Sequence, residues 1–242
     1  MQSDRSPLRR FDAVFIINLA SRTDRKREMQ QQLRQIGVDP ALAPVTFFEA
    51  VRPADAGGFP SLGARGCFMS HLGVLRQARA AGHRTILLLE DDVNFARDFP
   101  AGMRELDARL DQRGWDLAYL GALSVTPAPA HAGKSGPLPP ASAVVGSHML
   151  AIDAGIVPDL IDYLEAMLRR PPGDPAGGPM HMDGAYNRYR QSRPALRTLI
   201  CTPPLGTQRP SRTDVAALKW FDRMPAVRSL VAGIRRARAG SR

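Results

Sequence analysis

The chain has 242 residues, 44% of them hydrophobic, and its 33 Lys and Arg exceed its 23 Asp and Glu, which gives a net charge of +10. This length suits one large α/β domain or two small ones, with a core that needs no disulfide. The positive balance favours an anionic partner, and nucleic acid, an anionic membrane surface and a phosphorylated small molecule all qualify. The two cysteines, Cys67 and Cys201, are too few for a disulfide framework and lack the spacing of a zinc site, so we expect buried thiols in a reducing compartment.

Signals for export or membrane insertion are not found in the sequence. The first ten residues read MQSDRSPLRR, without an apolar run behind the arginines, and no stretch of about 18 apolar residues follows. We therefore expect neither a signal peptide nor a transmembrane helix, and a cytoplasmic protein.

The first ninety residues alternate between strand-like and helix-like segments. Residues 11–19 (FDAVFIINL) predict a strand, and residues 21–38 predict a helix with Ser21 or Thr23 as N-cap and Gly37 as its stop. Residues 45–51 (VTFFEAV) predict a short strand, residues 64–82 a helix, and residues 85–89 (TILLL) another strand. This β-α-β-α-β order predicts a parallel sheet with helices on its faces.

The second half continues the alternation with longer loops. We expect a helix over 98–115, a strand over 116–122, a strand over 143–152, and a helix from 153 to 170 with Asp153 as its cap. Residues 127–140 and 171–179 are rich in Pro and Gly and predict long loops, which are often binding loops or lids.

The last segment, residues 218–242, places apolar residues on one helical face beside several arginines. Two interpretations stay open. The segment is either a helix docked on the domain with a solvated basic end, or an amphipathic helix that lies on an anionic membrane surface.

Three consecutive acids, Glu90, Asp91 and Asp92, directly follow the predicted strand TILLL. An open parallel sheet binds ligands beyond the carboxyl ends of its strands, so these acids are expected at a binding site. Metal ligands, a general base and helix-capping residues are all open roles. A hard divalent cation would relieve the repulsion among all three anions, whereas capping would use only one of them.

Four motifs in order resemble glycosyltransferase family 25, the bacterial lipopolysaccharide and lipooligosaccharide sugar transferases related to the collagen galactosyltransferases. They are INLASRTDRK at 17–26, FFEAV at 47–51, GCFMSHLGVLRQA at 66–78 and LLLEDDVNF at 87–95. Weaker matches continue through WDLAYLG, GSHMLAI and TQRPSRTDV, so the resemblance covers residues 11–215 and leaves 216–242 as a basic tail. It implies a GT-A fold, in which a Rossmann-like, mostly parallel sheet is flanked by helices.

The resemblance also implies a UDP-sugar donor and a divalent cation, Mn²⁺ or Mg²⁺. Glu90 and Asp92 take the place of the family's acidic metal-binding motif, with Asp91 between them at the donor. In this position the cation would neutralise the charge that develops on the leaving diphosphate.

Nucleotide recognition is implied for Asn18, Arg22 and Arg25, which follow the first strand. An Asn side chain can pair with a uracil edge, and arginines can meet phosphate or ribose. The alternative is that Arg22 and Arg25 are solvated charges in the first turn of a helix, where cations are unfavourable unless an anion is near.

Donor binding is also implied for Ser70 and His71 on the second helix, and for Gln208 in the last matching motif. Adjacent helical residues point about 100° apart, so Ser70 and His71 are not a hydrolase nucleophile and base. The alternative for His71 is a histidine satisfied inside the core. His148 and His181 carry the same ambiguity.

Family 25 enzymes are assigned to inversion, which requires a base for the acceptor hydroxyl. Asp183 is the candidate in the acceptor half, and the alternative is an N-cap of a helix beginning at Gly184. Asp214 is a weaker candidate for the metal or donor site.

The resulting hypothesis is a metal-dependent transferase that moves a hexose, galactose or glucose, from UDP to a cell-surface glycan or glycolipid, beside the inner face of the cytoplasmic membrane. A metal-dependent phosphohydrolase would supply more scattered Asp and His ligands. A nucleic-acid-binding protein fits the charge, but the chain has 6% aromatic residues and no recognition motif, so we expect no nucleic-acid partner.

Overall fold

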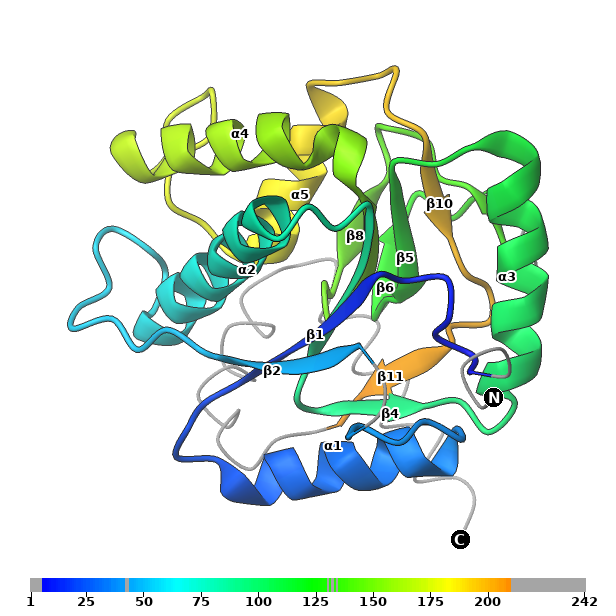
Figure 1. Cartoon of the computed structure of the whole chain (residues 1–242). Coiled ribbons are helices and arrows are strands. Elements are labelled where there is room, and N and C mark those ends of the chain that lie inside the picture. Colours follow the sequence, from blue (N-terminus) through cyan, green and yellow to red (C-terminus); the bar gives the residue numbers. More distant parts are fainter. Residues whose placement is uncertain (1–5, 42–43, 130, 132, 134, 210–242) are drawn as a thin grey trace, which may run out of the picture. The chain divides into compact units, whose positions relative to one another are not determined.

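A seven-stranded sheet forms the centre of the computed structural model, which describes residues 6–41, 44–129, 131, 133 and 135–209 (Figure 1). The strand order is β2-β1-β3-β9-β5-β10-β7. The bounds are β1 Ala13–Asn18, β2 Val45–Glu49, β3 Thr85–Glu90, β5 Leu117–Gly121, β7 Gly136–Pro137, β9 Met149–Asp153 and β10 Thr198–Ile200. Strands β2, β1 and β3 are parallel, as are β5 and β10, while β9 runs antiparallel between β3 and β5 and β7 antiparallel beside β10. The predicted α/β fold with a mainly parallel sheet is confirmed.

Five helices cover the two faces of this sheet. Their bounds are α1 Thr23–Gln35, α2 Leu62–Ala80, α3 Phe99–Arg113, α4 Val157–Arg169 and α5 Met182–Gln191. Helices α2, α4 and α5 share a core with Phe15 and Ile17, whereas α1 and α3 share one with Val14 and Ile16. Successive side chains of a strand point to opposite faces, so the continuous apolar run of β1 supplies both cores.

Three boundaries differ from the predictions. The expected strand over 143–152 is divided into β8 (Ala143–Val145) and β9 by Gly146, whose φ of 94° favours glycine and interrupts extended backbone. Helix α1 has Arg22 at its N-cap position, without a side-chain cap from Ser21 or Thr23. Asp153 does cap, but it caps the short 3-10 helix η2 (Ala154–Ile156) that precedes α4.

Two short antiparallel strand pairs outside the central sheet complete the architecture. β6 (Ser124–Thr126) pairs with β8, and β4 (Val93–Phe95) pairs with β11 (Gly206–Gln208), both antiparallel. The second pairing returns the end of the described chain to the segment that follows β3.

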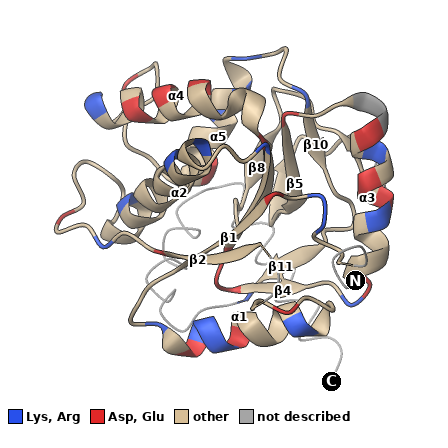
Figure 2. Cartoon of the chain, in the orientation of Figure 1, with Lys and Arg blue, Asp and Glu red and all other residues tan. Residues whose placement is uncertain are grey.

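The helices present charges of both signs. Figure 2 shows basic and acidic residues interspersed along α1, α3 and α4. In the part of the chain that the structure describes, no helix has both the length and the apolar character needed to span a bilayer. The predicted helix at 218–242 and Asp214 lie outside the described residues.

Candidate active site

The acid cluster, which comprises Glu90, Asp91 and Asp92, lies at the carboxyl end of β3. Glu90 is the last residue of β3, and the two aspartates form the turn into β4. Asp91 and Asp92 are each only 6% exposed. Parallel strands end at the same edge of a sheet, so the end of β1 lies beside this turn.

Asn18 and Arg25, which the family resemblance assigned to nucleotide recognition, contact the acid cluster. Asn18 Nδ2 donates to Asp91 Oδ2 at 2.7 Å and to the carbonyl oxygen of Arg22 at 3.2 Å. Arg25 Nη1 donates to Asp91 Oδ1 at 2.8 Å and lies 3.7 Å from Asp92 Oδ2. Arg25 thus directs a cation mainly at Asp91.

Arg22 takes a different contact. Its Nη2 donates to Asp24 Oδ2 at 2.8 Å, in the first turn of α1, and this guanidinium lowers the pKa of Asp24 below its usual range. An anion thus compensates the cation at the helix N-terminus. Arg22 matches the alternative of a first-turn surface charge, and it forms an ion pair with Asp24.

Gln208 reaches the acid cluster from the far end of the described chain. The antiparallel pairing of β11 with β4 sets Gln208 opposite Val93. Its Nε2 lies 3.2 Å from Glu90 Oε2 and 3.3 Å from Asp92 Oδ2, so one amide donor serves both carboxylates. The structure brings together Glu90, Asp92 and Gln208, which the sequence placed at one site only through the family resemblance.

Asp92 is the least satisfied member of the cluster. Burial, together with the charges of Glu90 and Asp91, raises the pKa of Asp92 to about 7. Among the residues that the structure describes, no hydrogen-bond partner meets the buried Oδ1 of Asp92. A hard divalent cation prefers carboxylate oxygens and would satisfy this atom, so the residues present fit Mn²⁺ or Mg²⁺.

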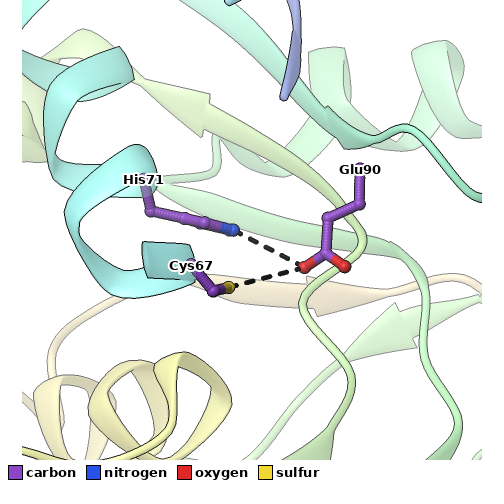
Figure 3. Close-up of side chains that lie close together, drawn as sticks. All are labelled: Cys67, His71 and Glu90. Atoms are coloured by element: carbon purple, nitrogen blue, oxygen red, sulfur yellow. Dashed lines mark hydrogen bonds and ion pairs between the residues drawn. The ribbon is translucent and has the colours of Figure 1, made fainter. Parts of the chain in front are cut away.

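The other side of Glu90 faces helix α2, from which Cys67 and His71 point toward it (Figure 3). His71 Nε2 lies 3.6 Å and Cys67 Sγ 3.9 Å from Glu90 Oε1. The loss of hydration at this carboxylate acts to raise its pKa, but the neighbouring His71 outweighs that effect and the pKa of Glu90 is lowered. His71 Nδ1 lies 3.2 Å from the hydroxyl of Tyr186 on α5.

Cys67 and Tyr186 were not predicted as site residues. The expectation for Cys67 was an inert buried thiol, yet it is partly exposed beside Glu90. Its separation of four residues from His71 is the signal that could have found it, because residues i and i+4 share one face of a helix. Tyr186 gave no comparable signal, since its contact with His71 joins α5 to α2.

Ser70 has a packing role, which differs from the predicted donor contact. It is fully buried, and its hydroxyl accepts from Val51 N at 2.9 Å and donates to Gly66 O at 2.6 Å. These bonds fasten α2 to the segment after β2, so Ser70 is left out of the site proposed below.

Asp183 lies in the first turn of α5, which begins at Met182 with His181 as its N-cap residue. Asp183 is thus two positions past the N-cap, the position that the alternative assigned to it. Its Oδ2 accepts from Gly146 N at 3.3 Å and its Oδ1 from Gly184 N at 2.8 Å. Burial and the charges of Glu90 and Asp183 together raise the pKa of the Cys67 thiol.

The two other histidines with an open role are partly or fully buried. Burial lowers the pKa of His148 and of His181, which favours neutral imidazoles. His148 Nε2 lies 3.5 Å from the carbonyl oxygen of Gly206, so this histidine packs under β11. His148 therefore lies in the core, but its buried Nδ1 has no hydrogen-bond partner among the described residues, so it is not fully satisfied there.

Residues 11–125 match the family model described as glycosyltransferase family 25 (LPS biosynthesis protein). The inactive glycosyltransferase 25 family member 3 of Homo sapiens is 29% identical over 135 residues, which cover 48% of this chain and 23% of the relative. Procollagen galactosyltransferase 1-B of Xenopus laevis is 28% identical over 129 residues, which cover 46% of this chain and 21% of the relative. The chain spans less than a quarter of the length of these relatives, and their names include both an inactive protein and a galactosyltransferase.

Two solved structures are similar to the chain at a more distant level. A glycosyltransferase involved in the glycosylation of the major capsid of PBCV-1 has a TM-score of 0.46 and 12% identity, with 79% of this chain and 82% of that chain covered. UDP-glucose pyrophosphorylase complexed with UDP-glucose has a TM-score of 0.45 and 9% identity, with 86% and 78% covered. We draw no conclusion about activity from likenesses this distant.

The matched residues include β1, α1, α2, β3 and the whole acid cluster. Through this region, the chain is similar to glycosyltransferase family 25.

Proposed function

We propose that the chain is a metal-dependent glycosyltransferase that transfers a hexose from a UDP-sugar to a glycan or glycolipid acceptor with inversion. One observation carries the proposal: Asp92 presents a buried carboxylate oxygen without a hydrogen-bond partner among the described residues, beside Glu90 and at the carboxyl end of a parallel strand. A site of this kind suits a cation that carries a diphosphate.

Each residue of the site has a role in this proposal. Glu90 and Asp92 hold Mn²⁺ or Mg²⁺, which when bound neutralises charge on the departing diphosphate. Gln208 fixes both carboxylates through its amide, and Arg25 and Asn18 hold Asp91, which keeps the turn between β3 and β4 in place. His71 lies behind Glu90 and favours its ionised form.

Asp183 is proposed as the base that accepts the proton of the attacking hydroxyl. The base must act on the sugar face opposite the diphosphate, so the metal-holding carboxylates cannot serve. Asp183 comes from α5, on a different element from the acid cluster, and its two backbone hydrogen bonds leave a lone pair on each oxygen. These bonds would fix the carboxylate in the orientation needed for proton transfer.

The names of the relatives point to galactose as the first donor to test, because several of them are procollagen galactosyltransferases. Other relatives are named inactive, so the residues of the site, rather than similarity, support an active enzyme. The interspersed charges of α1, α3 and α4 argue against a nucleic-acid surface on those helices.

The test is UDP binding and UDP release by the purified full-length chain. Calorimetry should detect UDP binding that requires Mn²⁺, and Asp92→Asn should remove that requirement together with most of the affinity. Turnover with UDP-galactose or UDP-glucose and an acceptor should fall about 10²- to 10⁴-fold in Asp183→Asn, with UDP binding unchanged.

The matched control is Asp98→Asn, an exposed aspartate ahead of α3. It should leave both assays unchanged. Equal Mn²⁺-dependent UDP affinity in wild type and Asp92→Asn would refute the metal site, and release of inorganic phosphate without any acceptor would favour the phosphohydrolase.

A further inference from the structure

Cys67, His71 and Glu90 offer a sulfur, a nitrogen and an oxygen atom that all lie within 4.8 Å of one another. Figure 3 shows the first two side chains projecting from α2 toward the carboxylate of Glu90. The separations to Glu90 Oε1 are 3.9 Å from Cys67 Sγ and 3.6 Å from His71 Nε2. A tetrahedral Zn²⁺ with its usual bond lengths separates such ligand atoms by about 3.3–3.6 Å.

The helix holds the first two residues in fixed positions. Cys67 and His71 are four residues apart on α2, and the intervening and following residues of this helix are packed into the core with the central sheet. His71 itself is fully buried. The site therefore needs only small movements of side chains to close around an ion.

His71 is oriented as a metal-ligating histidine would be. Its Nδ1 meets the hydroxyl of Tyr186, and that contact fixes the ring plane. Its Nε2 is buried and, among the described residues, has no hydrogen-bond partner, because 3.6 Å to Glu90 Oε1 exceeds hydrogen-bond length. An ion placed between this buried ring nitrogen and Glu90 would supply the partner that it lacks among the described residues.

We propose that Cys67, His71 and Glu90 form a binding site for a borderline-soft divalent cation, with Zn²⁺ as its ligand. Thiolate and imidazole ligands select Zn²⁺ or Co²⁺ over Mn²⁺ and Mg²⁺, which prefer oxygen. Three protein ligands leave a fourth position for water. Binding converts the Cys67 thiol to a thiolate and releases its proton to the solvent.

This site differs in its ligand atoms from the proposed Mn²⁺ or Mg²⁺ site at Asp92, where the protein ligands are carboxylate oxygens. The two oxygens of Glu90 face different neighbours: Oε1 faces Cys67 and His71, while Oε2 accepts from Gln208. The absence of a zinc-like spacing between the two cysteines does not exclude the site, since a histidine and a glutamate supply the remaining ligands.

Cobalt spectroscopy of the full-length chain tests the proposal without reference to transferase activity. The chain is first freed of metal with a chelator, dialysed and kept in a phosphine reductant. Titration with Co²⁺ should then give a thiolate-to-cobalt charge-transfer band that saturates at one equivalent. Addition of Zn²⁺ should abolish this band. Cys67→Ser should remove the band. Tyr186→Phe, which removes the hydroxyl at His71 Nδ1, should weaken Co²⁺ binding by about 10-fold.

Cys201→Ser is the matched control, because Cys201 is the other cysteine of the chain and is buried in the core shared by α1 and α3. It should retain the band. A wild-type chain without the band, or a band that survives Cys67→Ser, would overturn the proposal.

A second measurement covers the case in which Cys67→Ser does not fold. The partly exposed Cys67 of the wild-type chain should react with a maleimide, and stoichiometric Zn²⁺ should slow that reaction at least about 10-fold by occupying the thiolate. An unchanged rate of Cys67 labelling with Zn²⁺ would likewise overturn the site.

Discussion

The guanidinium of Arg190 and the carboxylate of Asp92 are both buried charged groups, but the fold satisfies them to different degrees. Arg190, near the end of α5, is 1% exposed and donates to the carbonyl oxygens of Pro139 (2.7 Å) and Ser142 (3.0 Å). It also reaches the side chains of Asn187 and Thr198, each at 3.3 Å. The planar guanidinium of Arg190 thus links α5 by hydrogen bonds to the loop before β8 and to β10.

Asp92 has fewer protein partners. Its Oδ2 is shared between Gln208 at 3.3 Å and Arg25 at 3.7 Å, and its Oδ1 has no hydrogen-bond partner among the described residues. Burial lowers the pKa of Arg190, but its five donors remain cationic, whereas the pKa of Asp92 rises to about 7.

The difference separates a structural charge from a binding charge. A buried group whose hydrogen bonds are all made within the protein stabilises the fold and has nothing left to offer a ligand. A buried group that remains partly unsatisfied costs stability in the free protein and gains it when a ligand of opposite charge binds. Substitutions at the two positions should therefore act in opposite directions.

The largest effect is expected for Arg190→Met. Methionine keeps much of the side-chain volume but leaves the carbonyl oxygens of Pro139 and Ser142 without their donor, so the free energy of unfolding should fall by about 3 kcal/mol. Guanidinium unfolding followed by circular dichroism measures it. Arg188→Met is the control on the exposed side of α5 and should change stability by less than about 0.5 kcal/mol. Equal losses in the two variants would remove the structural role of Arg190.

Asp92→Asn should stabilise the metal-free protein. The folded-state pKa of Asp92, about 7, lies above its ordinary value of 3.8, so the folded chain holds this proton more tightly than the unfolded chain. Wild-type stability should therefore fall as pH rises from about 4 to 7, and the full cost remains above pH 7. Asn carries no such proton, so the variant should gain about 2 kcal/mol at pH 8, with roughly 4 kcal/mol as the upper bound, and almost nothing at pH 4.

Thermal or urea unfolding at pH 4, 6 and 8 in the presence of a chelator measures this dependence. Asp98→Asn, exposed ahead of α3, is the control whose difference from wild type should stay flat with pH. Saturating Mn²⁺ should reverse the order at pH 8, because only wild type has the full ligand set. A stability difference that does not grow between pH 4 and 8 would contradict the assigned protonation of Asp92.

The sequence predicted the part of the site that depends on one strand and its immediate neighbours. The apolar run before Glu90 predicted β3, and ligands bind beyond the carboxyl ends of parallel strands, so the acids were expected at a binding site at this edge of the sheet. Asn18 and Arg25 are found there. Local periodicity also predicted four helices, α1 to α4, to within a few residues.

The rest depends on contacts between distant elements, which local patterns do not report. The antiparallel direction of β9 depends on where the chain returns to the sheet after β8. An apolar segment has the same residue pattern in a parallel and in an antiparallel strand, so the sequence does not predict this direction. Ser70 was assigned to the donor because it precedes His71, whereas its packing against Val51 appears only when α2 is docked. Tyr186 meets His71 only because α5 packs against α2.

A smaller effect is expected for Arg25→Gln, which removes the cation that faces the acid cluster. Its hydrogen bond to Asp91 is charge-assisted and mostly buried, so the metal-free protein should lose about 1 kcal/mol. Mn²⁺ should restore part of this loss, since a second source of positive charge compensates the acids. Unfolding with and without Mn²⁺ measures it. A loss that Mn²⁺ leaves untouched would mean that the cation does not bind at these carboxylates.

The smallest effect is expected for Arg22→Gln. Unlike the buried charges of Arg190 and Asp92, the charge of Arg22 is hydrated by solvent. The Arg22 side chain is 33% exposed and its partner Asp24 is 52% exposed, so water screens the pair and hydrates either group when the other is removed. The pH midpoint of acid unfolding should move only slightly, because the lowered pKa of Asp24 contributes stability above its ordinary value that is lost as pH falls. A double-mutant cycle with Asp24→Asn, followed by chemical unfolding at pH 7, should give no measurable coupling. Strong coupling would show that the first turn of α1 relies on this pair, and Arg22 would then belong with Arg190 as a charge that holds the fold.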